Sequence, residues 1–283
     1  MVRMSEAYPV KVTFVTVAYR TPDLIRTLLS GIEKLGFDFP FEYILVNNAP
    51  GDGTSEMARE RFPWVKVLDA PGNVGFAGGH NIAFREARGE YIMFINPDLI
   101  VFKGEMEKLL AAAERLPKSG IVGPRLMYPN HEMQRSFHRY PKLMTPVYRR
   151  TFLGRTSWGK RHVDWYFMRD VDEKKTIDVD GIFGAACLIR HDVLKEVGFF
   201  DERYFMYFED VDLCRRTREK GWRVIYFPDA VFVHYHTRES KVSRPWLILT
   251  NRLARAHISS AVKYFWKFRG KALPAVPEPI HET

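Results

Sequence analysis

The stretch VKVTFVTVAYRTPDLIRTLLSGIEKLGFDFPFEYILVNNA (10–49) decides the fold class of this chain. Its first run, 10–19, is rich in β-branched residues and is typical of a buried strand. A segment with helical spacing and a proline at its start follows over 22–35, and a second apolar run covers 41–49. This order predicts a strand, a helix and a second strand, the unit from which parallel sheets are built.

The same alternation continues beyond this unit. Helical patterns at 55–62 and 79–87 alternate with apolar runs at 65–70 and 90–98. We therefore predict an α/β fold with a mainly parallel central sheet and helices on both of its faces. Ligands of such sheets collect at the carboxyl ends of the strands. Four polar residues stand at the predicted ends: Tyr19, Asn47, Asn48 and Asp98.

The composition is that of a folded protein with anionic partners. The 283 residues suffice for one large domain or two small ones, and 46% hydrophobic residues exclude global disorder. The net charge of +9 favours nucleotide phosphates, nucleic acid or an acidic membrane surface, without choosing among them. Cys187 and Cys214 lack metal-ligand spacing, which indicates a reduced, cytosolic protein. We recognise no signal peptide and no membrane-spanning run, so we expect a chain that does not cross a membrane.

Two segments carry much of the positive charge. Residues 135–169 hold nine Lys or Arg against one acid, and we interpret them as a long excursion or a loosely ordered lobe. Residues 244–271 have a basic amphipathic helical pattern. Its apolar side holds Trp246, Leu253, Ala254, Ile258, Ala261, Tyr264, Phe265 and Phe268, and its basic side holds Arg252, Arg255, Lys263, Lys267 and Arg269. Such a helix either lies on anionic lipid or docks on the domain with its charges exposed.

Three motifs suggest a phosphate and metal site. Two lie in the first half of the chain, and the third lies on a predicted strand near residue 234. PGNVGFAGGHNIA (71–83) has four glycines that let the backbone approach a ligand, although a tight structural turn is the alternative. INPDLIV (95–101) places Asp98 at a strand end, as a cation ligand or as an ordinary turn residue. VFVHYHTRES (231–240) puts His234 and His236 on one strand face, as metal ligands or as plain polar residues.

A fourth motif, YFMYFEDVDLCRR (204–216), suggests a catalytic carboxylate. Glu209 and Asp210 lie at the amino end of a helix that we predict to end at Gly221. Helix capping explains one acid or two, because the helix dipole favours negative charge there. Capping does not explain the aromatic residues just before them. Aromatic rings commonly form platforms for sugars, and burial raises the basicity of a carboxylate.

Taken together and in order, these motifs resemble the inverting glycosyltransferases of family 2, which have the GT-A fold, and most closely their bacterial rhamnosyltransferase-like branch. The resemblance runs from Val10 to about Ser240. Its most specific parts are NVGFAGGHN, FINPD, FGAACLIR (183–190), VGFFDERYFMYFEDVDLCRR and GWRVIYFPDAVFVHYH. It implies a Rossmann-like GT-A domain over 1–240, including the excursion at 135–169. The remainder, 241–283, would be a basic amphipathic helix with a flexible tail.

The resemblance also implies a role for each matched residue. Asp210 would be the catalytic base, with Glu209 supporting it. Asp98 and His234 would hold Mn²⁺ or Mg²⁺ together with the donor diphosphate. The donor would be bound by Ala18, Tyr19, Asn47, Asp52, Asn73, Gly75, Phe76, Asn81, Asn96, Gly184 and Ala185. The sequence departs from the family pattern at Asn96, Asn47 and Arg20. These departures put the identity of the nucleotide base of the donor in doubt.

The implied reaction is transfer of a sugar, with L-rhamnose from dTDP-L-rhamnose as first choice, to a saccharide acceptor in bacterial cell-surface polysaccharide synthesis. The acceptor would be free or linked to polyprenyl diphosphate, and the enzyme would be cytoplasmic, with the inner membrane face as a further partner. UDP-hexose or UDP-N-acetylhexosamine is the alternative donor. A non-catalytic protein that binds nucleic acid or other anions is the alternative of a different class. We expect no nucleic-acid partner, because no nucleic-acid motif occurs and charge alone does not account for Asp98, Asp210 and His234.

Overall fold

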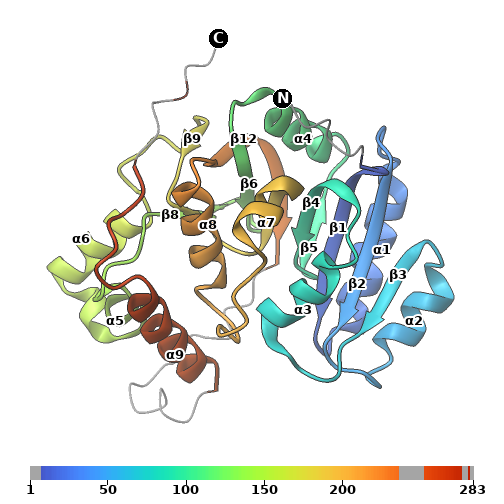
Figure 1. Ribbon diagram of the computed structural model, residues 1–283, viewed down its shortest axis with the longest axis horizontal. Coiled ribbons are helices and arrows are strands. Elements are labelled where there is room, and N and C mark those ends of the chain that lie inside the picture. Colours follow the sequence, from blue (N-terminus) through green and yellow to red (C-terminus); the bar gives the residue numbers. More distant parts are fainter. Residues whose placement is uncertain (1–7, 236–251, 276–279, 281–283) are drawn as a thin grey trace.

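A ten-stranded sheet forms the centre of the computed structural model, which describes residues 8–235, 252–275 and 280 (Figure 1). Eight strands follow one another across it: β3 (Val65–Asp69), β2 (Phe41–Asn47), β1 (Val10–Ala18), β4 (Gly89–Ile95), β11 (Ala186–Arg190), β6 (Ser119–Met127), β12 (Arg223–His234) and β5 (Leu99–Val101). Two short strands pair beside this path, β7 (Met133–Gln134) with β6 and β9 (Ile177–Asp178) with β12.

Four of the seven neighbouring pairs along the eight-strand path are parallel, as the predicted α/β sheet requires. β1 pairs parallel with β2 and β4, β2 with β3, and β6 with β12. β11 is antiparallel to both of its neighbours, β4 and β6, so it separates the parallel group of β3, β2, β1 and β4 from the parallel pair of β6 and β12. On the far side, β5 pairs antiparallel with β12. The register pairs Ala18 with Asn47 at the last position of β1 and β2. The carboxyl ends of β1, β2 and β4 therefore meet at one edge, where the sequence places its polar residues.

Helices cover both faces because the strands alternate their apolar side chains between them. Phe14, Leu45 and Met93 pack with one set of helices, whereas Val15, Ile44 and Phe94 pack with the other. The first set consists of α1 (Pro22–Leu35), α2 (Thr54–Arg61) and α4 (Glu105–Arg115). The second set consists of α3 (Gly75–Phe84), α7 (His191–Val197) and α8 (Glu209–Glu219).

Helix α3 begins at Gly75, four residues before the start that the sequence pattern predicts. The glycines inside it are not a loop. An added Cβ on Gly79 would lie 2.7 Å from the side chain of Val17, and one on Gly78 would lie 3.0 Å from that of Val74. Gly79 therefore lets α3 lie directly against β1 at the edge of the sheet, while Gly78 leaves room for the side chain of Val74 at the start of the helix.

The basic excursion 135–169 forms a helical lobe at the left of Figure 1. It contains β8 (Phe137–His138), which pairs with β10 (Gly181–Ile182), and then α5 (Thr145–Arg150), the 3₁₀ turn η1 (Phe152–Arg155) and α6 (Ser157–Tyr166). Threonine side chains accept hydrogen bonds at the starts of η1 and α6, from Leu153 and Gly159. The lobe is thus built from capped helices.

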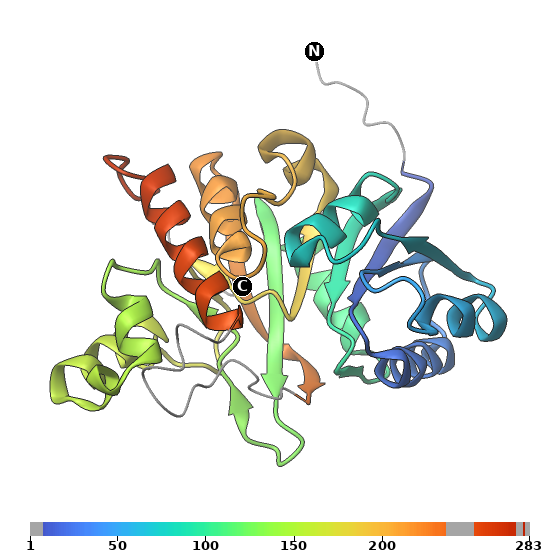
Figure 2. The same ribbon diagram turned by 90° about the horizontal axis from the view of Figure 1, so that it is seen from below.

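Helix α9 (Arg252–Lys267) docks on the domain beside α5 and α8 (Figures 1 and 2). Its Ala261, Tyr264 and Phe268 pack with Tyr204 and Phe208. Of the two arrangements that the sequence leaves open, lying on lipid or docking on the domain, the described part of α9 has the docked one. Residues 241–251, Trp246 among them, lie outside the described part of the chain. Within that described part, no helix is both long and apolar enough to cross a membrane.

Two residues of α9 lie on the side opposite to the one that the helical pattern predicts. Ile258, expected on the packed side, is 48% exposed. Lys267, expected on the basic solvent side, is partly buried and pairs with Asp201 at 2.8 Å and with Asp212 at 2.5 Å. The buried carboxylate of Asp212 stabilises the inward position of Lys267, because a buried charge requires a charged or hydrogen-bonding partner.

Candidate active site

The site lies at the carboxyl edge of β1, β2 and β4. Asn48 follows β2, its N–H donates a 2.8 Å hydrogen bond to the carbonyl of Ala18, and its side-chain Nδ2 donates another of 2.8 Å to the carbonyl of Gly75. The Oδ1 of Asn73 accepts a 3.1 Å hydrogen bond from the N–H of Gly75. Ala18, Asn73 and Gly75, predicted as donor-binding residues, are thereby held in one hydrogen-bonded group.

The aromatic loop before α8 rests on the start of α3. The N–H of Phe76 donates a 2.8 Å hydrogen bond to the carbonyl oxygen of Phe205. Gly75 has φ +80°, and an added Cβ there would clash with that same oxygen. Only glycine fits this position, because the backbone is left-handed and the aromatic loop leaves no space. The glycine-rich motif and the aromatic motif, far apart in sequence, thus form one surface.

Asp210 is held in a fixed orientation at the first turn of α8. Its Oδ2 accepts a 3.0 Å hydrogen bond from the N–H of Gly184, and its Oδ1 accepts one of 2.8 Å from Val211. An added Cβ on Gly184 would lie 3.2 Å from Cζ of Phe76, so the ring of Phe76 borders the same glycine. Burial raises the pKa of Asp210, although the two N–H donors and the charge of Arg149 oppose this rise. A carboxylate with these properties can accept a proton from a hydroxyl group.

Glu209 is less exposed to solvent than its neighbour Asp210, with only 4% of its surface exposed. Burial raises its pKa well above the usual range, and the adjacent Asp210 adds to the rise. Its Oε2 has no hydrogen-bond partner among the described residues. The pair therefore consists of one carboxyl that favours its neutral form and one, Asp210, that is oriented by backbone donors.

Asp98 and His234 form the second part of the site. Nε2 of His234 lies 3.2 Å from Oδ1 of Asp98, and its Nδ1 lies 2.9 Å from Oε1 of Gln134. The N–H of Tyr235 also donates to the carbonyl of Asp98 at 2.9 Å. This pairing follows from β12 and β5 lying side by side, with His234 opposite Leu99. His236 lies outside the described residues.

A backbone hydrogen bond links the two parts. The N–H of Asn96 donates to the carbonyl of Ala185 at 2.9 Å. Asn96 precedes Asp98 by two residues, and Ala185 directly follows Gly184, which holds Asp210. The turn of the proposed metal ligand and the turn that orients the proposed base are therefore joined at the junction of β4 and β11.

Comparison with known proteins identifies the family to which this arrangement belongs. The sequence model described as glycosyl transferase family 2 matches residues 13–198, which is more than half of the chain. The chain belongs to glycosyl transferase family 2. This confirms the resemblance that the motifs indicate.

Relatives of this family 2 glycosyltransferase include named rhamnosyltransferases. The N-acetylglucosaminyl-diphospho-decaprenol L-rhamnosyltransferase of Mycobacterium tuberculosis is 29% identical over 243 residues, which cover 82% of this chain and 77% of that protein. Rhamnosyltransferase WbbL of Escherichia coli K12 is 26% identical, and the match covers 91% of this chain and 94% of WbbL.

Solved structures support the predicted GT-A fold. The mannosyltransferase PcManGT of Pyrobaculum calidifontis, solved with GDP-Man and Mn²⁺, superposes with a TM-score of 0.58. The match covers 94% of this chain and 77% of that one at 18% sequence identity, so the likeness concerns the fold.

Other predicted donor residues of this glycosyltransferase are engaged within the protein. Nδ2 of buried Asn47 donates to Asp52 at 3.1 Å and to Ser55 at 3.0 Å, while its Oδ1 accepts from Ala49. Asn47 thus holds Asp52, whose Oδ2 also accepts from the N–H of Arg20. The neighbouring Tyr19 is 41% exposed at the same edge.

Asn81 of α3 binds the segment after α7. Its Nδ2 donates to the carbonyl of Phe200 and to Glu202, both at 2.9 Å, and its Oδ1 accepts from the N–H of Phe200 at 3.0 Å. The side chain therefore fastens the start of the aromatic loop to α3. This contact gives Asn81 a positioning role within the fold.

Sequence reasoning missed three residues of the site, Asn48 as a link to Gly75, Gln134 beside His234, and Arg149 near Asp210. Asn48 stood among the strand-end residues without a role. Arg149 belongs to the basic excursion, whose charge was noticed but not resolved into individual residues. Gln134 had no signal in the sequence, because its place depends on the pairing of β7 with β6.

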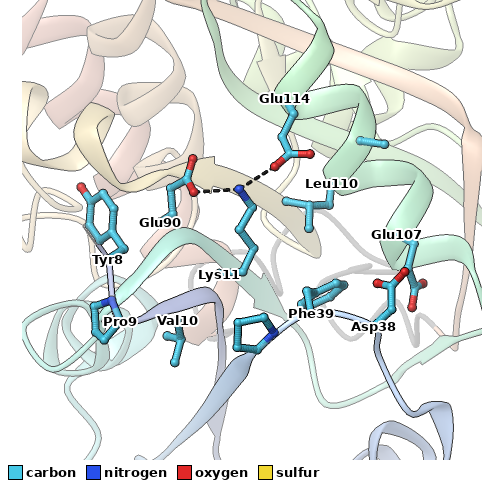
Figure 3. Close-up of a pocket in the computed structure, with 12 residues that line it drawn as sticks. Tyr8, Pro9, Val10, Lys11, Asp38, Phe39, Glu90, Glu107, Leu110 and Glu114 are labelled. Carbon is cyan, nitrogen blue, oxygen red and sulfur yellow. Dashed lines mark hydrogen bonds and ion pairs between the residues drawn. The ribbon is translucent and has the colours of Figure 1, made fainter. Parts of the chain in front are cut away.

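A cavity at the opposite edge of the sheet is separate from this site (Figure 3). Val10, Lys11 and Glu90 line it at the amino ends of β1 and β4. Lys11 bridges Glu90 at 2.7 Å and Glu114 at 2.5 Å within it. The cavity shares no residue with the predicted site, and its acidic lining does not suit a nucleotide phosphate.

Proposed function

We propose that this glycosyltransferase moves L-rhamnose from dTDP-L-rhamnose, with inversion, to a sugar attached to polyprenyl diphosphate, in the synthesis of a bacterial cell-surface polysaccharide. The name of the M. tuberculosis relative describes L-rhamnosyl transfer to a diphospho-decaprenol-linked sugar, and WbbL is also named a rhamnosyltransferase. The observation that carries the proposal is the backbone-held carboxylate of Asp210 beside Phe76, joined through Ala185 and Asn96 to the turn of Asp98.

Asp210 acts as the general base in this proposal. Its carboxylate accepts the proton of the acceptor hydroxyl while that oxygen forms a bond to the anomeric carbon of the donor. The bond from this carbon to the nucleoside diphosphate breaks on the opposite side, and the diphosphate leaves with the bonding electrons. The N–H of Gly184 keeps the carboxylate aimed at the acceptor, so little reorganisation is needed during the transfer.

Asp98 and His234 fit a hard divalent cation such as Mn²⁺ or Mg²⁺. Their facing atoms, Oδ1 and Nε2, are 3.2 Å apart, a carboxylate and an imidazole directed at each other. No cluster of three or more His, Cys, Asp or Glu with metal-ligand geometry occurs among the described residues. Two protein ligands suit Mg²⁺ or Mn²⁺, which usually take their remaining ligands from water and substrate phosphates. When bound, the cation supplies charge stabilisation for the departing diphosphate.

A transfer assay tests the proposal directly. The purified protein is incubated with Mg²⁺ or Mn²⁺, dTDP-L-rhamnose and a short-chain diphospholipid-linked N-acetylglucosamine, and products are identified by mass spectrometry. We expect one added deoxyhexose. Parallel reactions with GDP-mannose, UDP-hexoses and UDP-N-acetylhexosamines define the donor, and transfer from one of these but not from dTDP-L-rhamnose would replace the donor assignment.

We further propose that the enzyme acts at the cytoplasmic membrane surface through an exposed apolar ridge on α9, formed by Ile258, Val262 and Trp266. These side chains are 48%, 63% and 70% exposed and lie four residues apart, on one line of the helix. Exposed Arg255 and Arg269 flank the ridge. An apolar line with a tryptophan and adjacent arginines suits the interface of a bilayer that contains anionic lipid.

A further inference from the structure

We propose that Arg149 binds the phosphate group attached to the acceptor sugar, so that the enzyme selects acceptors with an anion one sugar ring away from the reacting hydroxyl. This inference rests on the proposed function and adds an acceptor subsite to it. It follows from the placement of one cation from the helical lobe beside the proposed base.

Arg149 is a cation held in place by aromatic rings rather than by an acid. Its guanidinium lies 5.1 Å from the ring centres of Tyr166 and Phe167 and 5.5 Å from that of Phe183. Its Nη1 donates a long hydrogen bond of 3.4 Å to the hydroxyl of Tyr166. No carboxylate lies within ion-pair distance of it in the described part of the chain. Aromatic faces hold a cation without neutralising it, so Arg149 keeps its capacity for an anionic ligand.

The ring of Phe183 connects Arg149 to the loop that holds Asp210. Phe183, one of its three aromatic neighbours, directly precedes Gly184, whose N–H binds the Asp210 carboxylate. Arg149 is also the nearby side-chain cation whose charge opposes the burial-induced rise in the pKa of Asp210. A hydroxyl that hydrogen-bonds to Asp210 would therefore leave the rest of its sugar within reach of Arg149.

A second observation comes from α9. His257 is buried, with 3% of its surface exposed, and its Nδ1 has no hydrogen-bond partner among the described residues. Its ring lies 5.1 Å from Tyr207 and 5.4 Å from Phe208, the residue before Glu209. The guanidinium of Arg150 lies 5.5 Å from the ring centre of Tyr207, the same ring that contacts His257. Burial and the charges of Arg150 and Arg149 lower the pKa of His257 to about 3. The region where α5 and α9 meet near the start of α8 thus combines positive charge with a polar atom that has no hydrogen-bond partner among the described residues.

These groups suit a phosphate of the acceptor better than the donor diphosphate. Within the described part of the chain, Asp98 and His234 form no hydrogen bond or ion pair with Arg149, whereas they do form hydrogen bonds with Gln134 and Tyr235. Arg149 contacts Phe183, which precedes the glycine that binds Asp210, and Asp210 is the residue proposed to receive the acceptor proton. In a sugar-diphospholipid the first phosphate is bonded to the anomeric carbon, and it is therefore separated from a ring hydroxyl by the sugar alone. A planar guanidinium is well suited to bind it through two hydrogen bonds.

Direct binding measurements test this subsite without requiring turnover. Calorimetry compares two probes, a short-chain alkyl diphosphate of N-acetylglucosamine and the neutral alkyl glycoside of the same sugar. The proteins are the unaltered enzyme, Arg149→Gln, Arg149→Lys and the control Arg155→Gln, which removes an exposed arginine of the same lobe. Thermal unfolding of each variant verifies that the fold is retained.

We expect Arg149→Gln to weaken binding of the diphosphate probe about 10- to 100-fold, the usual range for one charge-assisted contact. Arg149→Lys should recover part of the loss, while the neutral glycoside and Arg155→Gln should change less than about twofold. Equal losses for both probes, or no loss for the diphosphate, would overturn the subsite. Failure of rhamnosyl transfer with this binding pattern intact would instead count against the proposed donor and leave the subsite standing.

Discussion

The N–H of Gly184 donates a 3.0 Å hydrogen bond to Oδ2 of Asp210, across 26 positions of sequence. Gly184 stands between β10 and β11, whereas Asp210 lies in the first turn of α8. The bond therefore fixes the carboxylate relative to the sheet and not only relative to its own helix. Because Ala185, the next residue, accepts from Asn96, the same strand junction also positions the turn that carries Asp98.

Asp210→Asn should remove most of the transfer activity and leave donor binding intact. An amide keeps the size of the side chain but cannot accept the proton, so we expect kcat to fall about 10²–10⁴-fold. Steady-state kinetics and calorimetry with dTDP measure the two quantities. Asp229→Asn, which changes an exposed carboxylate, is the matched control. Unchanged kcat in Asp210→Asn would end the assignment of the base.

The rate should depend on pH through Asp210. Burial raises the pKa of this carboxyl, so its reactive ionised form is lost on acidification at a higher pH than for an exposed aspartate. We expect kcat/KM to fall on the acidic side at that raised pKa. Arg149→Gln should move the fall to still higher pH, since the arginine charge favours the ionised form. A pH–rate profile of both proteins measures the shift, and identical acidic limbs would contradict it.

Glu209→Gln should stabilise the protein, and increasingly so at higher pH. Burial and Asp210 raise the folded-state pKa of Glu209, so the folded state favours the protonated form. Its contribution to stability is complete at low pH and is lost as the pH rises through the folded-state pKa. Glutamine does not titrate, so we expect a gain of about 1–3 kcal/mol in the free energy of unfolding at alkaline pH and a smaller one in acid.

Denaturant unfolding at several pH values measures this difference. Glu132→Gln, at an exposed position, should show no comparable trend. A constant difference between the unaltered protein and Glu209→Gln across the pH range would contradict the proposed neutral form of Glu209.

Much of the fold could be predicted because local patterns and tertiary packing agree. Helix α1 begins and ends as predicted, since Pro22 suits a first helical position and Gly36, with φ +60°, ends it. The start of α3 was missed because Gly78 and Gly79 are typical of loops. In the structure, Gly79 lies close to Val17 of β1 and Gly78 lies close to Val74. Contacts with other elements decided that case.

The site was predictable where a motif carries its own chemistry, as at Asp210, and unpredictable where distant segments meet. Arg149 is one of nine cations in 135–169, and only the rings of Tyr166 and Phe183 distinguish it. The direction of Lys267 was likewise set by Asp212 on another helix. An amphipathic pattern gives the faces of a helix but not the acid that a single lysine will meet.

Asp98→Asn and His234→Gln should weaken donor binding only when a divalent cation is present. Both substitutions keep the approximate size of the side chain and impair a metal ligand, so we expect affinity for dTDP to fall at least about tenfold in Mn²⁺. In EDTA the variants and the unaltered protein should bind dTDP equally. Calorimetry in the two buffers checks this, and equal losses in both buffers would show that the residues bind the nucleotide without a metal.

Replacing the exposed ridge of α9 should reduce binding to membranes. The triple change of Ile258, Val262 and Trp266 to serine removes three side chains that are 48%, 63% and 70% exposed and make no part of the packed cluster of α9. We expect binding to vesicles of phosphatidylglycerol and phosphatidylethanolamine to weaken about tenfold or more, because the apolar area available to the lipid is lost. Co-sedimentation measures it, with Phe102→Ser as a control at an exposed apolar residue elsewhere.

The charge contribution is tested on the same vesicles. Arg255→Gln with Arg269→Gln should weaken binding to anionic vesicles, and added salt should weaken binding of the unaltered protein, whereas neutral phosphatidylcholine vesicles should bind both weakly. Thermal unfolding should be nearly unchanged in all of these variants, since the inward side of α9, with Tyr264 and Phe268, is untouched. Equal binding to neutral and anionic vesicles, or full binding by the ridge variant, would mean that α9 serves to hold the aromatic loop and that lipid is contacted elsewhere.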